Sequence, residues 1–324
     1  MLHITFWHWL GFILCILFFL LLDLGVIHRR ARVVGLAEAM AWSISWFALA
    51  MLFAAAIFTW RSRPEALQFT TGYVIELTLS LDNIMVMAVL FAYFRVPPEL
   101  QHRLLFWGII GVLIMRGAMI YAGVTLVAYY DWILYILGAF LICAGIKMLL
   151  SKKQMNLERN LVLRAARKVF SISENLDGRK FLTRVNGRLF LTPLALALLL
   201  IETMDLVFAV DSVPAVFSVT RNAFIIFTSN IFAILGLRSI YFVLAGAIGY
   251  FRYLNIGLSA VLVFIGVKML LDPHDREAKW FQVALPTSVS LMVVAAILLI
   301  SIALSVTAEH REKAASFSKN ASPP

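Results

Sequence analysis

The sequence predicts an all-α, polytopic membrane protein with about nine transmembrane helices, six of which form two inverted three-helix repeats. Hydrophobic residues make up 62% of the 324 residues and charged residues only 14%. The mean hydropathy of +0.90 is far above that of a soluble domain of this length. The apolar residues form long runs, and two parts of the chain repeat the same charged residues at the same spacing.

Nine apolar runs approach the length of roughly 17–25 residues that a helix needs to cross a bilayer. They lie near residues 6–27, 39–60, 69–94, 104–128, 132–150, 190–216, 223–249, 254–271 and 281–307. The first run has neither a basic start nor a small-residue cleavage site, and it is too long for a signal peptide. We therefore expect it to remain in the protein as the first helix.

These runs divide the chain into six regions. They are helices one and two (1–67), a first three-helix repeat (68–151), a basic linker (152–189), a second repeat (190–272), helix nine (273–308) and a cytoplasmic tail (309–324). Within the linker, residues 157–170 are apolar at helical spacing on one side and cationic elsewhere. This pattern predicts a surface helix on anionic lipid headgroups, with a solvated linker as the alternative.

The basic residues predict the orientation. One set of alternate loops holds 19 Lys and Arg residues and the other set holds 5. Because basic loops stay in the cytoplasm, we expect the N-terminus outside and the C-terminus inside. Topology thus accounts for the formal charge of +10, and nucleic-acid binding is not indicated. Cys15 and Cys143 both lie in apolar runs, which indicates neither a disulfide framework nor a thiolate metal site.

The two repeats are recognised by their charged residues. GIKMLL at 145–150 matches GVKMLL at 266–271, and ELTLSLDN from Glu76 matches DLVFAVDS from Asp205. Arg116 and Arg238 lie between these segments at matching positions. Because each copy has three helices, the second copy enters the membrane from the opposite side, which makes the repeat inverted.

Ionisable residues at membrane depth cost about 2.5–3.5 kcal/mol each on insertion scales, so they indicate function or structural ion pairs. The acids are Asp23, Glu76, Asp82, Glu202, Asp205 and Asp211, and the bases are Arg116, Lys147, Arg238 and Lys268. Arg116 and Arg238 are the best candidates for holding acids in position. Asp23, Lys147 and Lys268 lie near helix ends, where a side chain can extend to the interface.

Helical geometry places Glu76 and Asn83 within about 20° of one face, and Asp205 and Ser212 likewise. Asp82 and Asp211 lie about 120° from their partner acids. Both acids of a pair therefore face one site only if the helix is distorted. Pro214 is a candidate distortion in the second repeat, because it offers no N–H to the carbonyl of residue 210.

Carboxylate, amide and carbonyl oxygens are hard ligands suited to Mg²⁺, Ca²⁺ or Mn²⁺. The predicted metal ligands are Glu76, Asp82, Asn83, Glu202, Asp205 and Asp211. Met85, Met87 and Met204 lie close in sequence and either soften the site or only pack. Asn230 either lines the path or bonds a backbone carbonyl.

At these residues the chain resembles the TerC family of bacterial and plastid membrane proteins, and within it the Alx-type manganese exporters. The stretches TGYVIELTLSLDNIMVM, FAYFRVP, ETMDLVFAVDSVPAVFSVT and TSNIFAILGLRSIYF are typical of the family, and the resemblance spans about residues 69–271. It implies a bacterial inner-membrane protein that exports metal ions, chiefly Mn²⁺, with tellurium resistance linked to some members. The five acids from Glu76 to Asp211 are the implied metal or coupling residues.

We therefore expect a Mn²⁺ exporter, with Mn²⁺ as substrate, protons as the coupling ion and no organic cofactor. Outward movement of a divalent cation against an inside-negative potential costs about 4.6 kcal/mol per 100 mV, from about 2.3 per charge. No G-x-x-x-x-G-K motif indicates ATP binding. One alternative is an assembly or stress-resistance factor whose buried charges are structural. Another is a Mg²⁺-dependent lipid-modifying enzyme built on Glu202 and Asp205.

Overall fold

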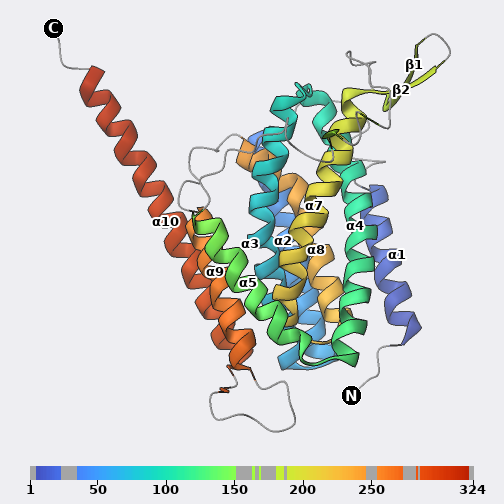
Figure 1. Ribbon diagram of the computed structural model, residues 1–324, viewed down its shortest axis with the longest axis vertical. Coiled ribbons are helices and arrows are strands. Elements are labelled where there is room, and N and C mark those ends of the chain that lie inside the picture. The colour runs from blue at the N-terminus through green and yellow to red at the C-terminus, as the bar shows by residue number, and fades with distance from the viewer. Residues whose placement is uncertain are drawn as a thin grey trace.

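The computed structural model in Figure 1 describes residues 5–22, 35–150, 163–164, 168, 180–185, 188–245, 254–272, 282–283 and 285–320. The described helices are α1 (Phe6–Leu22), α2 (Leu36–Trp60), α3 (Arg63–Tyr93), α4 (Pro98–Tyr129), α5 (Ile133–Leu150), α7 (Pro193–Phe217), α8 (Ala223–Ala245), α9 (Leu254–Leu271) and α10 (Thr287–Asn320). Strands β1 (Leu182–Val185) and β2 (Arg188–Leu191) pair antiparallel in one hairpin.

The predicted class, a helical polytopic membrane protein, is confirmed. Within the described residues, eight helices are long and apolar enough to cross a membrane. The ninth, α1, is described over Phe6–Leu22, where every residue belongs to the predicted run. These 17 described residues rise about 26 Å, against a hydrocarbon core of about 30 Å. The end of the predicted run at 6–27 lies outside the described residues.

Several helices begin earlier or end later than the apolar runs, because polar residues cap or extend them. Helix α3 begins at Arg63, where the hydroxyl of Ser62 accepts a hydrogen bond from the Glu65 N–H at 3.3 Å. Helix α7 is capped in the same way by Thr192. Helix α10 continues to Asn320 through residues too polar to count as membrane core.

Helix α8 lies at the centre of the bundle, since 83% of the residues in its most apolar stretch are buried. It packs against α2, α3 and α4, while α7 packs against α3 and α4. Buried side chains of these helices and α1 form a first hydrophobic cluster, in which Phe12, Phe69 and Phe232 are members. This arrangement gives α3, α4, α7 and α8 a shared interior.

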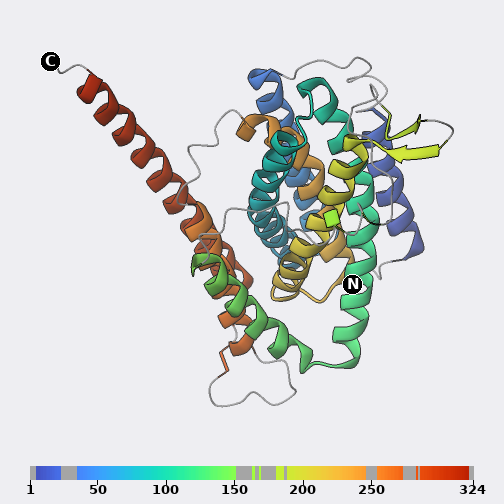
Figure 2. The same cartoon turned by 45° about the horizontal axis from the view of Figure 1, so that its top comes forward.

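Helices α5, α9 and α10 form a second group beside the central helices (Figure 1). Helix α5 packs chiefly on α9, and α10 packs on α9 and α3. Small residues allow the close approach that stabilises helix pairs in a membrane, as where Gly257 of α9 meets Ser301 of α10. Figure 2 shows α10 extending past the rest of the bundle towards its C-terminal end.

The β1–β2 hairpin precedes α7, and its end is tied to the helix by Thr192, whose hydroxyl donates to the Lys180 carbonyl at 2.9 Å. Most of the predicted surface helix at 157–170 lies outside the described residues. Leu163, one of its described members, is only 1% exposed and belongs to the first hydrophobic cluster. At this residue the linker contacts the bundle.

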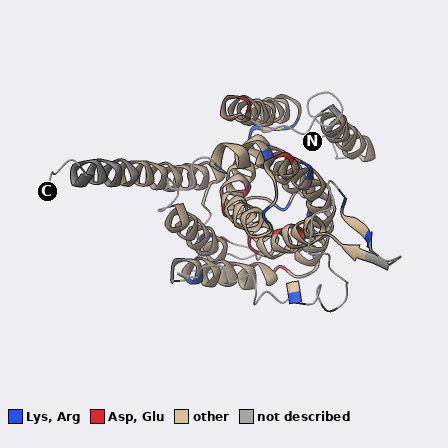
Figure 3. Ribbon diagram, turned by 90° about the horizontal axis from the view of Figure 1, so that it is seen from above, with Lys and Arg blue, Asp and Glu red and all other residues tan. Residues whose placement is uncertain are grey.

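Charged residues are present inside the bundle as well as on its ends. Seen along the helices in Figure 3, acidic and basic positions lie within the central group of helices. The acids Glu76 and Asp205 and the bases Arg116, Arg238 and Lys268 are all buried. Their positions define the site described next.

Candidate cation-binding site

The buried side chain of Arg116 on α4 lies between two acids from different helices. Its Nη2 donates to Oδ1 of Asp205 at 3.2 Å and its Nε to Oδ2 at 3.3 Å, so the pair is bidentate. Its Nη1 also pairs with Oε1 of Glu76 on α3. None of the three side chains is more than 1% exposed. One guanidinium therefore pairs with acids from both predicted repeats.

Three neutral side chains complete what we call the Arg116 cluster. Ser212 and Asn230 accept hydrogen bonds from Arg116 Nη1 at 3.1 and 3.0 Å. The amide of Asn83 donates to Oδ1 of Asp205 at 3.2 Å. Asn230 also donates to the backbone carbonyl of residue 226 at 3.1 Å. The cluster thus joins α3, α4, α7 and α8 through Arg116, Glu76, Asp205, Asn83, Ser212 and Asn230.

Beside this cluster lies a small cavity of about 30 Å³, which we call the acidic cavity. This volume exceeds the minimum of about 10–15 Å³ needed to hold one water molecule, so a desolvated cation also fits. The lining residues are Glu76, Leu79, Asp82, Asn83, Met148, Phe208, Asp211, Ser212, Leu258 and Leu262.

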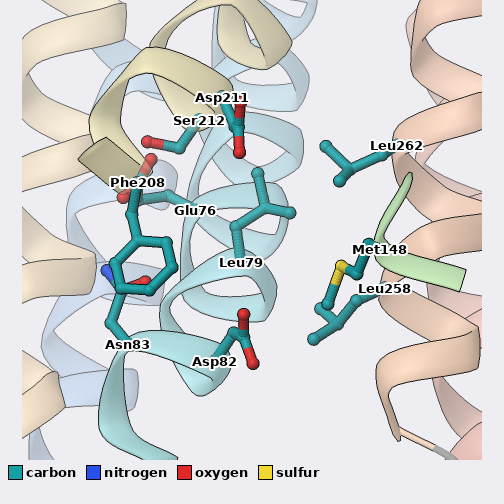
Figure 4. A pocket seen from close by; sticks show the side chains of 10 residues that line it. All are labelled: Glu76, Leu79, Asp82, Asn83, Met148, Phe208, Asp211, Ser212, Leu258 and Leu262. Atoms are coloured by element: carbon teal, nitrogen blue, oxygen red, sulfur yellow. The ribbon is translucent and has the colours of Figure 1, made fainter. Parts of the chain in front are cut away.

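The acidic cavity has two unlike walls (Figure 4). All five of its polar side chains come from α3 and α7, and the side chains from α5 and α9 are Met148, Leu258 and Leu262. In Figure 4 the carboxylates of Asp82 and Asp211 lie at the two ends of the cavity, with Leu79 between them. Oxygen ligands are therefore confined to one side.

Two buried oxygens at this wall accept no hydrogen bond within the described part of the protein. They are Oε2 of Glu76 and Oδ1 of Asn83. Buried acceptors without a donor are costly and uncommon. Both residues line the acidic cavity, but the two oxygens themselves have almost no accessible surface, so a cation would reach them only after a local rearrangement.

The remaining acids of the cavity interact through their charges. Asp211 is close enough to Asp82, and to Lys147 on α5, for their charges to interact. Within the described residues, however, His, Cys, Asp and Glu side chains nowhere gather in groups of three or more that could hold a metal ion. In this conformation Arg116 occupies the position between Glu76 and Asp205.

Glu202 lies apart from the acidic cavity, on the side of α7 that faces α4. Its carboxylate packs against Gly111, where an added Cβ would lie 2.2 Å from Oε1. Its charge interacts with that of Asp205, and its buried Oε2 has no hydrogen-bond partner in the described residues. The spacing of Glu202 and Asp205 thus places them as neighbours, but they face different surroundings.

The predicted supporting residues differ in burial. Lys268, whose place near a helix end would allow it to extend to the interface, is instead 3% exposed; its Nζ donates to the Ser218 carbonyl at 2.8 Å and lies 3.7 Å from Oδ2 of Asp272. A buried ammonium group needs a hydrogen-bond partner, and that carbonyl is one. Lys147 is exposed and Arg238 is 6% exposed. Asp23 lies outside the described residues.

The helix geometry needs less distortion than the sequence suggested. Helix α3 is continuous, and yet Glu76 and Asp82 both line the acidic cavity. On α7 the two acids do diverge, with Asp205 facing Arg116 and Asp211 facing the cavity. Pro214 lies in the last turn of α7, which continues to Phe217.

Sequence reasoning missed one cavity residue with a metal-binding atom. Met85, Met87 and Met204 are absent from the lining of the acidic cavity, whereas Met148 belongs to it. The available signal was its position in GIKMLL, directly after Lys147. That signal was ambiguous because the same motif recurs in the second repeat.

The fold and the site define a class: an all-helical, multi-pass membrane protein with buried acids around one arginine. Comparison with known proteins gives the family, because residues 61–313 match the model described as "Integral membrane protein TerC family". The chain belongs to the TerC family. No solved structure matches it.

Three bacterial relatives are similar to this chain over nearly their whole length. "Uncharacterized membrane protein STKORF319" of Myxococcus xanthus is 49% identical over 92% of this chain and 91% of its own. Proteins named "Putative membrane-bound redox modulator Alx" are 40% identical in Salmonella typhi and 41% in Escherichia coli K12, over 94% of this chain and 95% of theirs.

Proposed function

We propose that this protein exports divalent metal cations, Mn²⁺ foremost, through the acidic cavity, with the cation as its substrate and no catalytic step. One observation supports this most directly. Two acids from different helices, Asp82 and Asp211, line one cavity of about 30 Å³, and Glu76 and Asn83 line it beside them. Hard oxygen donors of this kind suit Mn²⁺, Mg²⁺ and Ca²⁺.

Protons are the proposed counter-ion. Export against an inside-negative potential needs a driving force of about 4.6 kcal/mol per 100 mV for a divalent cation. Carboxylates that the cation leaves are partly desolvated, and desolvation favours the neutral, protonated form. Asp82 and Asp211 can therefore return protons, while Arg116 keeps Glu76 and Asp205 paired when no cation is bound.

The inverted repeat is part of the proposal, and the packing of α5 on α9 supports it. A Cβ added at Gly266 would lie 2.6 Å from the Gly138 carbonyl oxygen, and one added at Gly145 would lie 2.9 Å from the Ser259 carbonyl oxygen. GIKMLL and GVKMLL align Gly145 with Gly266, and hence Gly138 with Ser259. Replacing each residue of the Gly266–Gly138 contact by its equivalent in the other repeat therefore gives the Gly145–Ser259 contact. A two-fold axis in the membrane plane, which relates inverted repeats, requires this equivalence.

We also propose an inner-membrane location with the N-terminus outside and the C-terminus in the cytoplasm. In Figure 1, α1 begins at one end of the bundle and α10 ends at the other, which suits an odd number of crossings. The hairpin before α7 lies at the same end as the end of α10. Both adjoin the basic segments that favour the cytoplasm.

The name of the Alx relatives suggests a second reading, in which the chain modulates redox state. Its two cysteines are the side chains best suited to reversible oxidation. Cys15 on α1 and Cys143 on α5 are both exposed and free, and these helices lie on opposite sides of the bundle in Figures 1 and 2. The two thiols are therefore poorly placed to pair, so we favour transport.

Reconstitution in proteoliposomes tests the proposal, with a pH dye and a Mn²⁺ indicator in the lumen. Wild type is compared with Asp211→Asn and with Asp131→Asn, which removes an acid that is about half exposed in the α4–α5 turn. We expect Mn²⁺ and protons to move in opposite directions in wild type and Asp131→Asn, and Mn²⁺ flux to vanish in Asp211→Asn.

Other outcomes separate the parts of the proposal. Mn²⁺ flux without proton counterflow would remove the coupling but leave transport. Absence of Mn²⁺, Ca²⁺ and Mg²⁺ flux in folded wild-type protein would remove transport and favour a structural or stress-resistance role for the buried acids.

A further inference from the structure

The wall of the acidic cavity formed by α5 and α9 contains a single side chain able to coordinate a metal. Leu258 and Leu262 of α9 offer only hydrocarbon, whereas Met148 of α5 has a thioether sulfur. Figure 4 shows this sulfur directed into the cavity, across from Asp82. A cation held by the oxygens of α3 and α7 would therefore face the sulfur of Met148.

The equivalent residue of the other repeat has different surroundings. Met269 follows Lys268 as Met148 follows Lys147, in the last turn of its helix. Met269 is 0% exposed and belongs to the second hydrophobic cluster, with Val261 and Ile265 of α9. Packing accounts for Met269. Met148 is half-buried: it packs against the edge of the same cluster and also lines the acidic cavity, so packing alone does not account for its position.

We propose that Met148 determines the cation specificity of the acidic cavity, favouring transition-metal cations over Mg²⁺ and Ca²⁺. This inference rests on the proposed transport function and deepens it. Mg²⁺ and Ca²⁺ take oxygen ligands almost exclusively, and Mg²⁺ requires a near-complete octahedron of them. Thioethers are soft ligands that select softer transition metals, and Mn²⁺, although it also suits oxygen ligands, is softer than Mg²⁺ and Ca²⁺.

A sulfur in place of one oxygen therefore penalises the hard cations more than the transition metals. Specificity is a difference between two affinities, and a ligand that suits one cation poorly contributes as much as one that suits the other well. The apolar side chains beside Met148 strengthen the effect, because Leu258 and Leu262 give a partly hydrated Mg²⁺ no acceptor for its water molecules.

The test measures cation binding and transport separately, on full-length protein with Met148→Leu and Met269→Leu. Leu for Met conserves volume and polarity and removes only the sulfur. Equilibrium dialysis in detergent gives dissociation constants for Mn²⁺, Cd²⁺ and Mg²⁺, with Cd²⁺ as a soft probe. Proteoliposomes give Mn²⁺ flux in competition with Mg²⁺ and Ca²⁺.

We expect Met148→Leu to lower the preference for Cd²⁺ over Mg²⁺ by about tenfold, since substitutions close to a metal typically change its affinity by about that much. The preference for Mn²⁺ over Mg²⁺ should fall as well. Met269→Leu should retain wild-type preferences. Leu258→Met, which adds a second sulfur to the same wall, should raise the Cd²⁺ preference and keeps the inference testable if Met148→Leu is poorly folded.

Unchanged preferences in both Met148→Leu and Leu258→Met would overturn the inference and leave the proposed transport intact. Binding with a Met148-dependent preference but no flux in any protein would uphold the inference and remove transport. Failure of folded wild-type protein to bind any of the three cations would overturn both.

Discussion

Arg116 of α4 binds Asp205 of α7 through two parallel hydrogen bonds of 3.2 and 3.3 Å, in a place from which solvent is excluded. Bidentate pairs of this kind combine charge with fixed geometry. Since the same guanidinium pairs with Glu76 of α3, Arg116 links α3, α4 and α7 through buried ion pairs.

Arg116→Gln should destabilise the protein strongly, because it leaves the carboxylates of Glu76 and Asp205 buried without a cation. Removing one partner of a buried pair costs about 3–5 kcal/mol. Thermal unfolding in detergent and abundance in the membrane measure the effect, and both should fall.

The matched control is Arg221→Gln. Arg221 pairs with Asp131 at 2.6 Å, but their side chains are 47% and 51% exposed. Exposed pairs contribute about 0–1 kcal/mol, so this variant should unfold close to the wild-type temperature. Equal stabilities for the two variants would mean that Arg116 is not the cation holding the interior together.

Asp205→Asn and Asp211→Asn should behave differently although both acids lie on α7. Asp205 is paired with Arg116, so its amide variant loses one charge of the buried pair and should lower abundance. Asp211 faces the acidic cavity, so Asp211→Asn should keep normal abundance and abolish Mn²⁺ tolerance in a Mn²⁺-sensitive bacterial host. Immunoblots and growth on Mn²⁺ separate the two effects. Low abundance of Asp211→Asn would assign that acid to the structure.

Much of the fold was accessible from the sequence because membrane helices need long apolar runs. All nine predicted runs correspond to helices in the described residues. Their ends were less accessible: capping by Ser62 starts α3 at Arg63 rather than near residue 69, capping by Thr192 starts α7 at Pro193 rather than near residue 190, and the C-terminal part of α10 is too polar to be detected by hydropathy. Hydropathy detects membrane core, whereas caps and helix-forming polar residues determine where a helix ends.

The sequence identifies most residues of the candidate site but does not show how they are arranged in space. Rare charges at membrane depth identified Arg116 and the acids, since composition alone shows their cost. Periodicity alone left both Met148 and Met269 unplaced, because the surrounding motifs are nearly identical. Which copy lines a cavity depends on how α5 and α9 pack against α3 and α7, a relationship between distant segments.

Gly266→Ala should destabilise the pairing of α5 with α9. The added Cβ would lie 2.6 Å from the Gly138 carbonyl oxygen, a backbone atom that moves only with its helix. Overpacking of this kind costs about 1–3 kcal/mol. Gly11→Ala on α1 is the control, since a Cβ there meets nothing within 4 Å and alanine favours helix by about 1 kcal/mol. Thermal unfolding in detergent should fall for Gly266→Ala and hold or rise for Gly11→Ala. A stable Gly266→Ala would show that the helices separate at little cost.

Gly111→Ala tests the place of Glu202 without changing any charge. The new Cβ would lie 2.2–2.4 Å from all three carboxylate atoms of Glu202, so the carboxylate must move, and a flexible side chain can do so without unfolding the bundle. If Glu202 serves the transport path, Mn²⁺ flux should fall by roughly tenfold to a hundredfold while abundance stays normal. Shifts of about 1 Å in a functional group lower enzyme rates by about that much. Gly108→Ala, on the same helix, meets only Ile201 at 3.5 Å and should transport like wild type. Proteoliposome flux for both variants beside Glu202→Gln decides the matter. Equal flux in Gly111→Ala and Gly108→Ala, with Glu202→Gln also active, would place Glu202 outside the path and leave Asp82 and Asp211 as the acids that handle the cation.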